Sequence, residues 1–405
     1  MSNVNNKFYL SFFIIIIFSA ITDYNTQILY IKFDSLSVYK LFFNSYIYLS
    51  LFYLPLTNLT NLNNFFENYV KFFFIVFILY GFLIILLSIE NFTSLASIFG
   101  NPTYGPIFLS PLFLLWGTQK NALFWFNKFC IFSISIGIFI FFLSLIFEFY
   151  FSVNLFFPIF YLIIAFNYQS FNNKVLIIFA SFVSPYVFLT LNYRFGLMLF
   201  SFSVFVLLLT SLKSRLLLFI FKILFLLSPI LFILSLIYFE FNFFKFLTSF
   251  FSTNSDFSID TRSILYYEFF NQLSFKEILF GKGVLGTYYS EYFYFYRDIG
   301  GDNFLRPTIE VGFLHFILKG GLIYFLIFYI FVSLVVLKKY LSFYFLALSL
   351  YLSIFLALTF LENYPYFSIK IIIMWILISF CISKIFNKCT DEQIKNIIAN
   401  KYYFK

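Results

Sequence analysis

Arginine is rare in this chain, which carries 26 lysines and arginines but only five arginines. In a topology of twelve membrane spans, four of the five fall on the outer side: Arg194, Arg262, Arg297 and Arg306. A guanidinium binds a phosphate or carboxylate through paired hydrogen bonds, which a lysine ammonium cannot do. These arginines therefore predict a site for an anionic head group such as a pyrophosphate. Pairing with neighbouring loop carboxylates is the structural alternative.

Arg194 is distinguished by its position. It lies in a break of a few residues, 191–196, between two apolar runs. A charge at or within a membrane interface is costly and usually functional. We therefore expect Arg194 to contribute to catalysis.

Glu310 and His315 flank the point where the chain enters a long apolar run. A carboxylate in the first turn of a helix is favoured by the helix dipole, and it could also act as a general base toward an acceptor hydroxyl. His315 is the single histidine of the chain. Five residues place it about 140° round a helix from Glu310, so the two side chains do not share a face. His315 is either a buried, hydrogen-bonded side chain or a proton-transfer group.

A glycine-rich turn occupies residues 281–286. Ser274 and Glu277 form the pattern of a capping box, which predicts a short helix that Gly281 closes. Glycine lets the backbone approach a ligand closely, so we expect Gly281, Lys282 and Gly283 to bind substrate. As a phosphate loop the signal is weak, because no strand precedes the turn and no Lys-Ser/Thr pair follows it.

Metal and cofactor sites have no support in the sequence. The three cysteines, Cys130, Cys381 and Cys389, stand singly, without a CxxC pair or a nearby histidine. A Ser-His-Asp catalytic triad would require His315, the one histidine of the chain. We therefore expect neither a metal nor a cofactor.

The amino-acid composition is very apolar, and it determines which kind of element can position these residues. Of 405 residues, 62% are hydrophobic and 11% charged, and the mean hydropathy is +0.95. About 25% of residues are charged in soluble domains, so this chain belongs in a membrane. Apolar runs of roughly 20 residues recur, each long enough to cross the hydrocarbon core as a helix. We predict an all-α, polytopic membrane protein, and the net charge of +9 indicates membrane topology rather than nucleic-acid binding.

Twelve membrane spans are predicted. They lie at about 8–22, 38–56, 70–89, 103–118, 123–147, 152–168, 174–191, 195–212, 216–239, 309–337, 340–360 and 367–385. With twelve spans, most flanking lysines fall on the side that holds both termini, which the positive-inside rule makes cytoplasmic. The chain then divides into spans one to nine (1–239), an outer loop or cap (240–308), spans ten to twelve (309–385) and a cytoplasmic tail (386–405).

The 240–308 segment is the one long loop of this topology, and it faces outward. Its many tyrosines and phenylalanines argue that it folds as a cap on the membrane. Residues 260–273 read as an amphipathic helix, followed by the capped helix that Gly281 closes. Long loops in compact folds usually carry function.

The topology and motifs together resemble the Wzy-type O-antigen and capsule polysaccharide polymerases and the related O-antigen ligases. The resemblance rests on Arg194 at the break before the eighth span, on Arg262 followed by the 278–286 turn, and on Glu310-x-Gly-Phe-Leu with Gly320-Gly321. It implies a GT-C-like, metal-independent glycosyltransferase of the bacterial inner membrane with a large periplasmic loop. The implied substrate is an oligosaccharide carried by undecaprenyl pyrophosphate, and the implied partners are membrane lipids and a chain-length regulator, without nucleic acid.

The resemblance implies that the growing glycan is transferred from its lipid carrier to a new lipid-linked repeat unit. Arginines would hold the departing pyrophosphate, and Glu310 would help to deprotonate the acceptor hydroxyl. Two alternatives stay open: an O-antigen ligase or other lipid-linked glycosyltransferase, and a polysaccharide flippase or transporter. Transporters usually show helix breaks at matching positions in two halves, whereas the glycines and the long loop of this chain lie in its last third.

Overall fold

The computed structural model describes residues 67–90, 94, 97–98, 108–118, 121–147, 153–191, 193–238, 261–290, 305–309, 311–360 and 369–399. Within these ranges, the side chains of 116–118, 194, 235–238 and 261–264 are outside the description. The predicted spans at 8–22 and 38–56 also lie outside the described residues.

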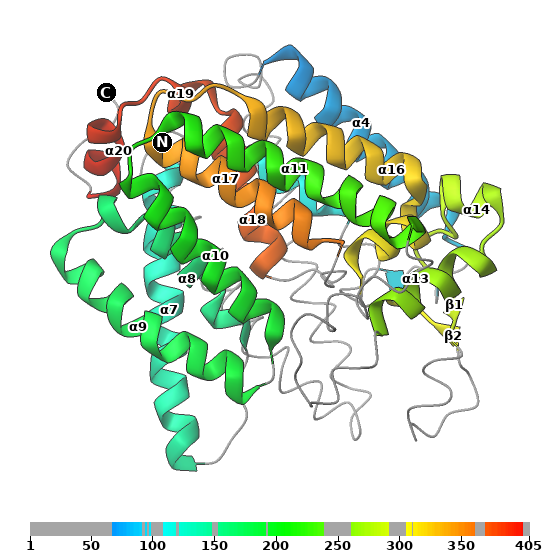
Figure 1. Cartoon of the computed structure of the whole chain (residues 1–405), viewed down its shortest axis with the longest axis horizontal. Coiled ribbons are helices and arrows are strands. Elements are labelled where there is room, and N and C mark those ends of the chain that lie inside the picture. The colour runs from blue at the N-terminus through cyan, green and yellow to red at the C-terminus, as the bar shows by residue number, and fades with distance from the viewer. Residues whose placement is uncertain are drawn as a thin grey trace.

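The described elements are almost all helices (Figure 1). In chain order they are α4 (Asn68–Leu87), η2 (Ser110–Thr118), α7 (Ala122–Phe147), η3 (Val153–Phe156), α8 (Pro158–Ile164), η4 (Phe166–Tyr168), α9 (Phe171–Thr190), α10 (Arg194–Ser211), α11 (Arg215–Tyr238), α13 (Thr261–Gln272), α14 (Phe275–Phe280), β1 (Tyr288–Tyr289), β2 (Leu305–Arg306), α16 (Gly312–Leu337), α17 (Phe343–Leu358), α18 (Ile369–Ile382), α19 (Lys384–Asn387) and α20 (Asp391–Ile398). The chain is therefore an all-α protein with one minimal pair of strands in its described part.

Five of the described helices, α4, α7, α9, α11 and α16, are long and apolar enough to cross a membrane. Four shorter apolar helical segments accompany them, at 153–164, 195–211, 343–358 and 369–382. Large apolar side chains point outward from the long helices, and Leu87 of α4 is 77% exposed. Such surfaces are stable in lipid, where a helix satisfies its own backbone hydrogen bonds. The protein is membrane-embedded.

Two predicted spans differ from continuous α-helices. The span expected at 103–118 contains the 3-10 helix η2, and the span expected at 152–168 is divided into η3, α8 and η4. Proline explains the second division, because Pro158 lacks the N–H that an uninterrupted helix would use and instead occupies the first position of α8. The total of twelve spans thus remains a prediction.

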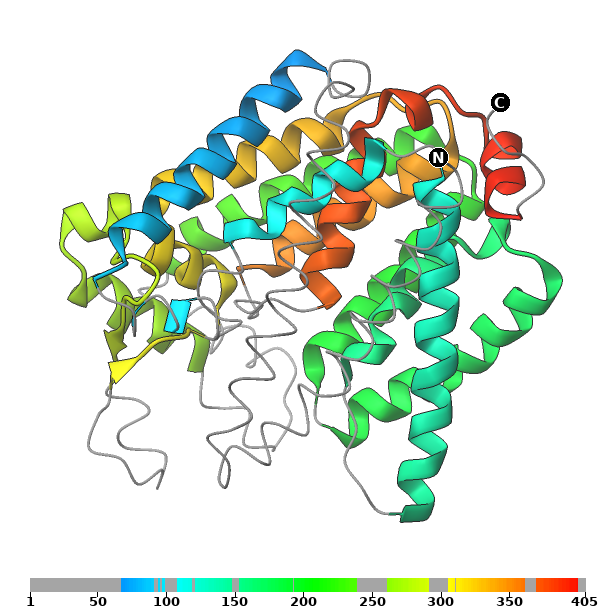
Figure 2. The same cartoon turned by 180° about the vertical axis from the view of Figure 1, so that it is seen from behind.

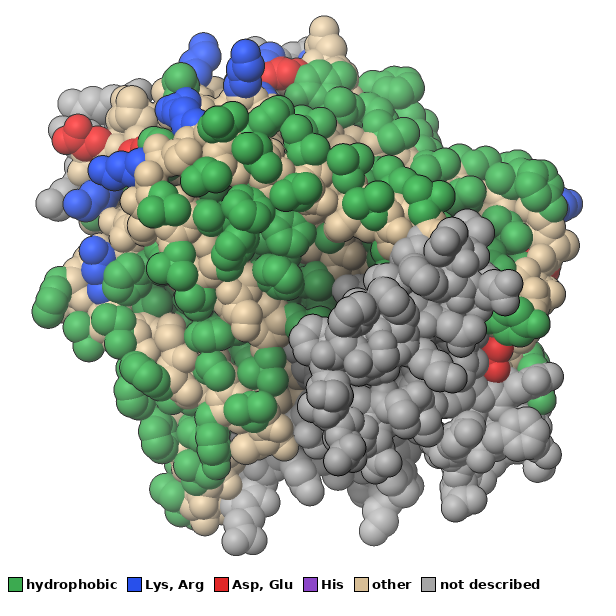
Figure 3. Space-filling model, in the orientation of Figure 1, with side chains coloured by type: hydrophobic (Ala, Val, Ile, Leu, Met, Phe, Trp, Pro, Cys, Tyr) green, Lys and Arg blue, Asp and Glu red, His purple; other side chains and the backbone are tan. Residues whose placement is uncertain are grey.

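Basic side chains gather at one end of the helix bundle. Figure 3 shows them along the edge occupied by α19, α20 and the nearby helix ends. The ammonium of Lys338, just after α16, lies 2.8 Å from the Glu67 carboxylate that precedes α4. Arg215, at the start of α11, donates hydrogen bonds to the carbonyls of Tyr340 and Leu341 before α17. We call this end the basic face.

The C-terminal helix α20 also belongs to the basic face. Asp391 accepts hydrogen bonds from the Tyr168 hydroxyl and from the backbone N–H groups of Phe343 and Tyr344. Its carboxylate thereby satisfies donors at the N-terminus of α17, where a negative charge is favoured. Ile394 beneath it is buried. Helix α20, within the tail, is therefore docked on the bundle.

Aromatic side chains fill the centre of the bundle between α4, α16 and α18. The Phe77 ring makes edge contacts with Tyr324, Phe328 and Trp375, with centroids 5.3, 6.2 and 6.0 Å apart. The Tyr80 ring stacks on Tyr324 at 5.5 Å. Edge and stacked pairs at such distances stabilise beyond their buried area. Helix α16 is thus held firmly against its neighbours.

Helix α16 is interrupted at Gly321. This residue has φ 78° and ψ 169°, so the element consists of two helical parts, before and after Gly321. Those dihedral angles are essentially restricted to glycine. Non-helical backbone at membrane depth is tolerated only where it is buried in protein or lines a cavity. The backbone N–H and C=O groups at the break therefore need hydrogen-bond partners from other elements.

Candidate functional site

A small folded cap lies at the end of the bundle away from the basic face (Figures 1 and 2). We use "cap" for α13, α14, the glycine turn 281–286, β1 and β2. Its helix α13 confirms the amphipathic helix expected at 260–273.

Tyr266 anchors α13 to the bundle. Its hydroxyl donates to the carbonyl of Phe360, after α17, at 2.8 Å. Its ring lies 6.2 Å from that of Phe313 in α16 and 5.7 Å from that of Phe232 in α11. One buried side chain therefore joins α13 to the ends of three membrane helices.

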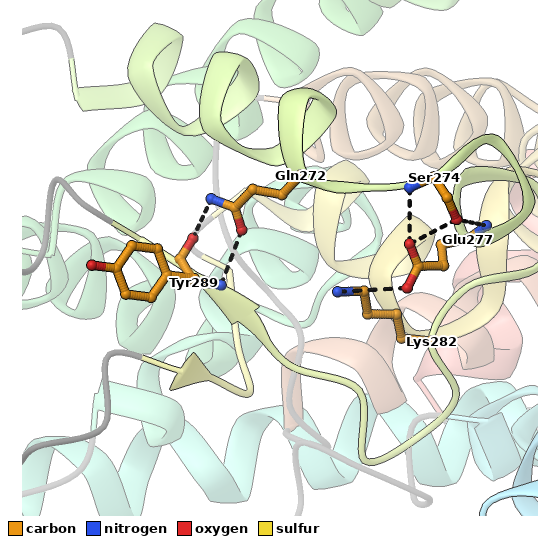
Figure 4. A network of polar contacts seen from close by, with 5 residues as sticks. All are labelled: Gln272, Ser274, Glu277, Lys282 and Tyr289. Carbon is orange, nitrogen blue, oxygen red and sulfur yellow. Dashed lines mark hydrogen bonds and ion pairs between the residues drawn. The ribbon is translucent and has the colours of Figure 1, made fainter.

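The strands β1 and β2 close the cap on its outer side. Tyr288 pairs with Arg306 and Tyr289 with Leu305 in antiparallel register. The Gln272 amide, at the end of α13, both donates to the Tyr289 carbonyl at 2.6 Å and accepts from the Tyr289 N–H at 3.1 Å (Figure 4). These bonds hold β1 against α13, and Arg306 on β2 is attached to the cap through its pairing with β1.

Helix α14 begins with the predicted capping box. The Ser274 N–H and hydroxyl both donate to the Glu277 carboxylate at 2.8 Å, and the Glu277 N–H donates to the Ser274 hydroxyl (Figure 4). The two bonds to the carboxylate lower the pKa of the Glu277 carboxyl, and the bond from the Ser274 backbone N–H has the larger effect. The Lys282 ammonium, 3.7 Å from the same carboxylate, acts in the same direction. Glu277 is therefore a structural carboxylate of the cap.

The glycine turn is locked into the break of α16. The Lys282 N–H donates to the Leu318 carbonyl at 2.7 Å. Gly281, which has φ +78°, lies so close that an added Cβ would be 2.7 Å from the Gly321 nitrogen. A Cβ on Gly321 would be 2.2 Å from the Leu279 carbonyl oxygen. The two glycines permit direct backbone contact between α14 and α16.

Lys319 also holds the glycine turn through hydrogen bonds. This side chain is 1% exposed, and its ammonium donates to the carbonyls of Val284 at 2.8 Å and Gly286 at 2.7 Å. On the opposite side, the Val284 N–H donates to the Ser88 hydroxyl at 3.0 Å, at the end of α4. Bonds to a charged donor are stronger than neutral ones. The turn is thus fixed to both α16 and α4.

A hollow of about 770 Å³ opens between the glycine turn, α14 and the end of α4. Its lining residues are Ile84, Leu87, Ser88, Glu90, Lys276, Glu277, Phe280, Gly281, Lys282, Gly283, Leu285, Gly286 and Thr287. Two lysines, Lys276 and Lys282, and two glutamates, Glu90 and Glu277, line it together with apolar side chains of α4, and the Lys282 ammonium lies 3.7 Å from the Glu277 carboxylate. Such a lining can hold an oxyanion next to a hydrocarbon chain. This hollow is the candidate site.

The residues expected to bind or react are distributed as follows. Lys282 lines the hollow, with a side chain that is 26% exposed, and Gly281 and Gly283 form its floor. Both glycines also have a packing role, since a Cβ on Gly283 would lie 2.8 Å from the Ser88 hydroxyl. Their presence is therefore explained by the fold without a ligand.

The other expected residues do not line the hollow in the described part of the chain. His315 is buried in the first half of α16, one turn before Lys319. Arg194 begins α10 and Arg262 lies in the first turn of α13, with side chains outside the description. Glu310 and Arg297 lie outside the described residues.

Two lysines that the sequence did not single out as site residues, Lys319 and Lys370, are buried in the structure. The role of Lys319 could not be predicted, because its acceptors are backbone carbonyls more than thirty residues away in the chain. Lys370, in α18, is a lone lysine within an apolar run, and its ammonium lies 4.4 Å from the ring centroid of Phe195. A single charge inside a predicted span was the available signal.

Within the described residues, no group of three or more histidine, cysteine, aspartate or glutamate side chains could hold a metal ion. The chain matches no family model, no curated protein and no solved structure.

Proposed function

We propose that this protein is a membrane glycosyltransferase that polymerises a surface polysaccharide, of the kind that Wzy-type polymerases carry out. Its substrates would be oligosaccharide repeat units on undecaprenyl pyrophosphate. The protein would have about twelve spans in a GT-C-like arrangement in the bacterial inner membrane. By the positive-inside rule, the basic face with both termini would be cytoplasmic and the cap periplasmic.

The hollow beside the cap is the observation that carries this proposal. Its wall on α4 carries apolar side chains, of which Leu87 is 77% exposed, while Lys276 and Lys282 provide two ammonium groups beside the carboxylates of Glu90 and Glu277. A lipid-linked phosphate has the same division between an apolar chain and a charged head. The chain would lie along α4, the phosphates would meet the lysines, and the sugars would extend into the cap.

The proposed chemistry is a single glycosyl transfer. An acceptor hydroxyl oxygen forms a bond to the anomeric carbon of the donor glycan, and the bond from that carbon to the pyrophosphate oxygen breaks. The hydroxyl proton passes to Glu310, and the pyrophosphate leaves with the bonding electron pair. Lysine and arginine side chains at the site, Arg194 and Arg262 among them, would stabilise the charge that develops on the leaving group.

A transporter is the second candidate, favoured by the break in α16. Discontinuous helices are typical of transporters, whose substrates and ions bind the freed backbone groups. In this protein, the Leu318 carbonyl accepts the Lys282 N–H and the Gly320 carbonyl accepts the Tyr80 hydroxyl. These carbonyls at the break are already engaged, one with the cap and the other with α4, which supports a structural purpose for the break.

Electrophoresis of surface polysaccharide tests the proposal. A strain without the gene should make a single repeat unit in place of a ladder, and the wild-type gene should restore the ladder. Arg262→Ala and Glu310→Ala should stay in the membrane yet fail to restore it, whereas Lys71→Ala, on the basic face, should restore it. Lipid-linked polymer that is made but not attached would indicate a ligase. An unchanged ladder in the deletion strain would refute the proposal and favour transport.

A further inference from the structure

Helix α4 spans the distance between the basic face and the cap. It begins directly after Glu67, whose carboxylate binds the Lys338 ammonium of the basic face. Directly after its last residue, the Ser88 hydroxyl accepts the Val284 N–H of the glycine turn. The 20 residues of α4 measure roughly 30 Å, which matches the thickness of a bilayer hydrocarbon core. The glycine turn therefore lies at the level of the lipid head groups, in the leaflet opposite the basic face.

One face of α4 is apolar and exposed along its whole length. Five large side chains that recur every three or four residues are each more than half exposed: Phe72, Ile75, Leu79, Leu83 and Leu86. Residues at this spacing share one face of a helix, and such a face is stable against lipid. Leu87 continues the apolar surface into the lining of the hollow. The lipid-facing stripe of α4 therefore reaches the cap.

Helix α14 extends this apolar surface beyond α4. Both views of the fold place it beside the end of α4 (Figures 1 and 2). Its first residue, Phe275, is 76% exposed, and its last, Phe280, is 53% exposed and lines the hollow together with Leu87. Lys276 follows Phe275 and also lines the hollow. Phenylalanine and lysine side chains are typical of helices that lie in the plane of the membrane interface.

Polar groups at both ends of α14 are paired within the protein. At its start, the Ser274 N–H donates to the Glu277 carboxylate, which lies 3.7 Å from the Lys282 ammonium. At its end, the Gly281 N–H donates to the Glu277 carbonyl and the Lys282 N–H to the Leu318 carbonyl. Backbone groups without partners are costly near hydrocarbon. These ends of α14 can therefore enter the interface with their hydrogen bonds intact.

We propose that α14 is an interfacial helix that binds phospholipid in the leaflet opposite the basic face. Phe275 and Phe280 insert below the lipid phosphates and continue the lipid-facing stripe of α4. Lys276 extends to the phosphate oxygens, since a lysine stem lies along apolar surface while its ammonium stays in the polar layer. This contact holds the cap at the level of the head groups, whatever reaction takes place in the hollow.

Spin labels on single cysteines measure the depth of α14 in the full-length protein, in nanodiscs of phosphatidylethanolamine and phosphatidylglycerol. Collisions with oxygen, which partitions into lipid, and with a nickel chelate, which stays in water, report the depth of each label. Labels at Phe275→Cys and Phe280→Cys should lie about 5–10 Å below the phosphates. The native cysteines are buried, so the unsubstituted protein gives the background.

Two control positions calibrate this measurement. Tyr289 is exposed on β1, at the outer side of the cap, so a label at Tyr289→Cys should collide readily with the nickel chelate. Leu83 belongs to the exposed stripe of α4, so a label at Leu83→Cys should collide with oxygen and be protected from nickel.

Nickel accessibility at either α14 label as high as at Tyr289 would overturn the interfacial position, because it would place that part of the helix in water. Low accessibility to both reagents would also overturn it, since protein would then cover this surface. If a cysteine variant is not monodisperse, Phe275→Trp keeps a large aromatic side chain and is measured by quenching with lipids brominated on their acyl chains. Quenching beyond that of the native tryptophans supports insertion, and its absence overturns it.

Discussion

Substitution of Gly321 by alanine should undock the cap. Gly321 has φ 78° and ψ 169°, and an added Cβ would lie 2.2 Å from the Leu279 carbonyl oxygen and 2.5 Å from the Phe280 carbonyl carbon. A non-glycine residue in this backbone region costs about 1–3 kcal/mol. Moving α14 away also removes the hydrogen bond from the Lys282 N–H to Leu318, worth about 0.5–1.5 kcal/mol. The docking free energy should therefore fall by about 1.5–4.5 kcal/mol.

Hydrogen exchange of the Lys282 amide measures this loss directly. Opening of the cap exposes the amide, so its exchange rate reports the docking free energy. At 1.4 kcal/mol per factor of ten, the expected loss accelerates exchange by roughly 10- to 1,600-fold. Amides in the middle of α7 should keep their wild-type rates, because the change is local.

Gly137→Ala provides the matched control. Gly137 lies within α7, and its added Cβ would be 3.3 Å from the Leu155 Cβ and 3.4 Å from the Phe156 ring. Small adjustments relieve such contacts, and alanine favours the helix by up to about 1 kcal/mol. This variant should leave Lys282 exchange unchanged. Wild-type exchange at Lys282 in Gly321→Ala would refute the interlock of α14 with α16.

Three further changes test other contacts. Lys319→Met should release the glycine turn, since two charge-assisted bonds to Val284 and Gly286 are lost, and protease cleavage within 281–286 should accelerate at least tenfold in membranes while α7 stays intact. The pKa of Glu277 is lowered in the folded cap, so its stabilising contribution is present above the unfolded pKa and lost as the pH falls through the folded pKa. The protection of the Lys282 amide, measured as its exchange rate relative to the intrinsic rate at the same pH, should therefore fall on acidification in the wild type and not through this group in Glu277→Gln. Asp391→Ala should weaken the docking of α20 by about 1–3 kcal/mol, seen as faster tryptic cleavage of the tail, whereas Glu392→Ala should not change it.

Local patterns in the sequence predicted parts of the cap well. The capping box of Ser274 and Glu277 and the helix stop at Gly281 are interactions among residues within eight positions of one another, so sequence suffices to find them. The apolar runs likewise predicted membrane helices, because composition alone decides solubility in lipid.

Contacts between distant segments could not be read from the chain. The break at Gly321 could not be predicted, because α14 and the glycine turn, about forty residues earlier, fill the space beside it, and the Lys282 N–H of that turn donates to the Leu318 carbonyl. The role of Lys319 was hidden for the same reason, since carbonyl acceptors leave no side-chain signature in a sequence. The sixth predicted span is divided because of Pro158. Hydropathy does not detect the effect of a proline on the local backbone.

The central claim is that this protein joins lipid-linked repeat units, and the most direct measurement is the in vitro elongation of such units by the purified full-length protein in nanodiscs. Supplied with pyrophosphate-linked repeat units alone, the wild type should produce a ladder of longer lipid-linked glycans and release one undecaprenyl pyrophosphate per unit added. Glu310→Ala should produce none, and Lys71→Ala should match the wild type. Intact repeat units after prolonged incubation with the wild-type protein would contradict the claim.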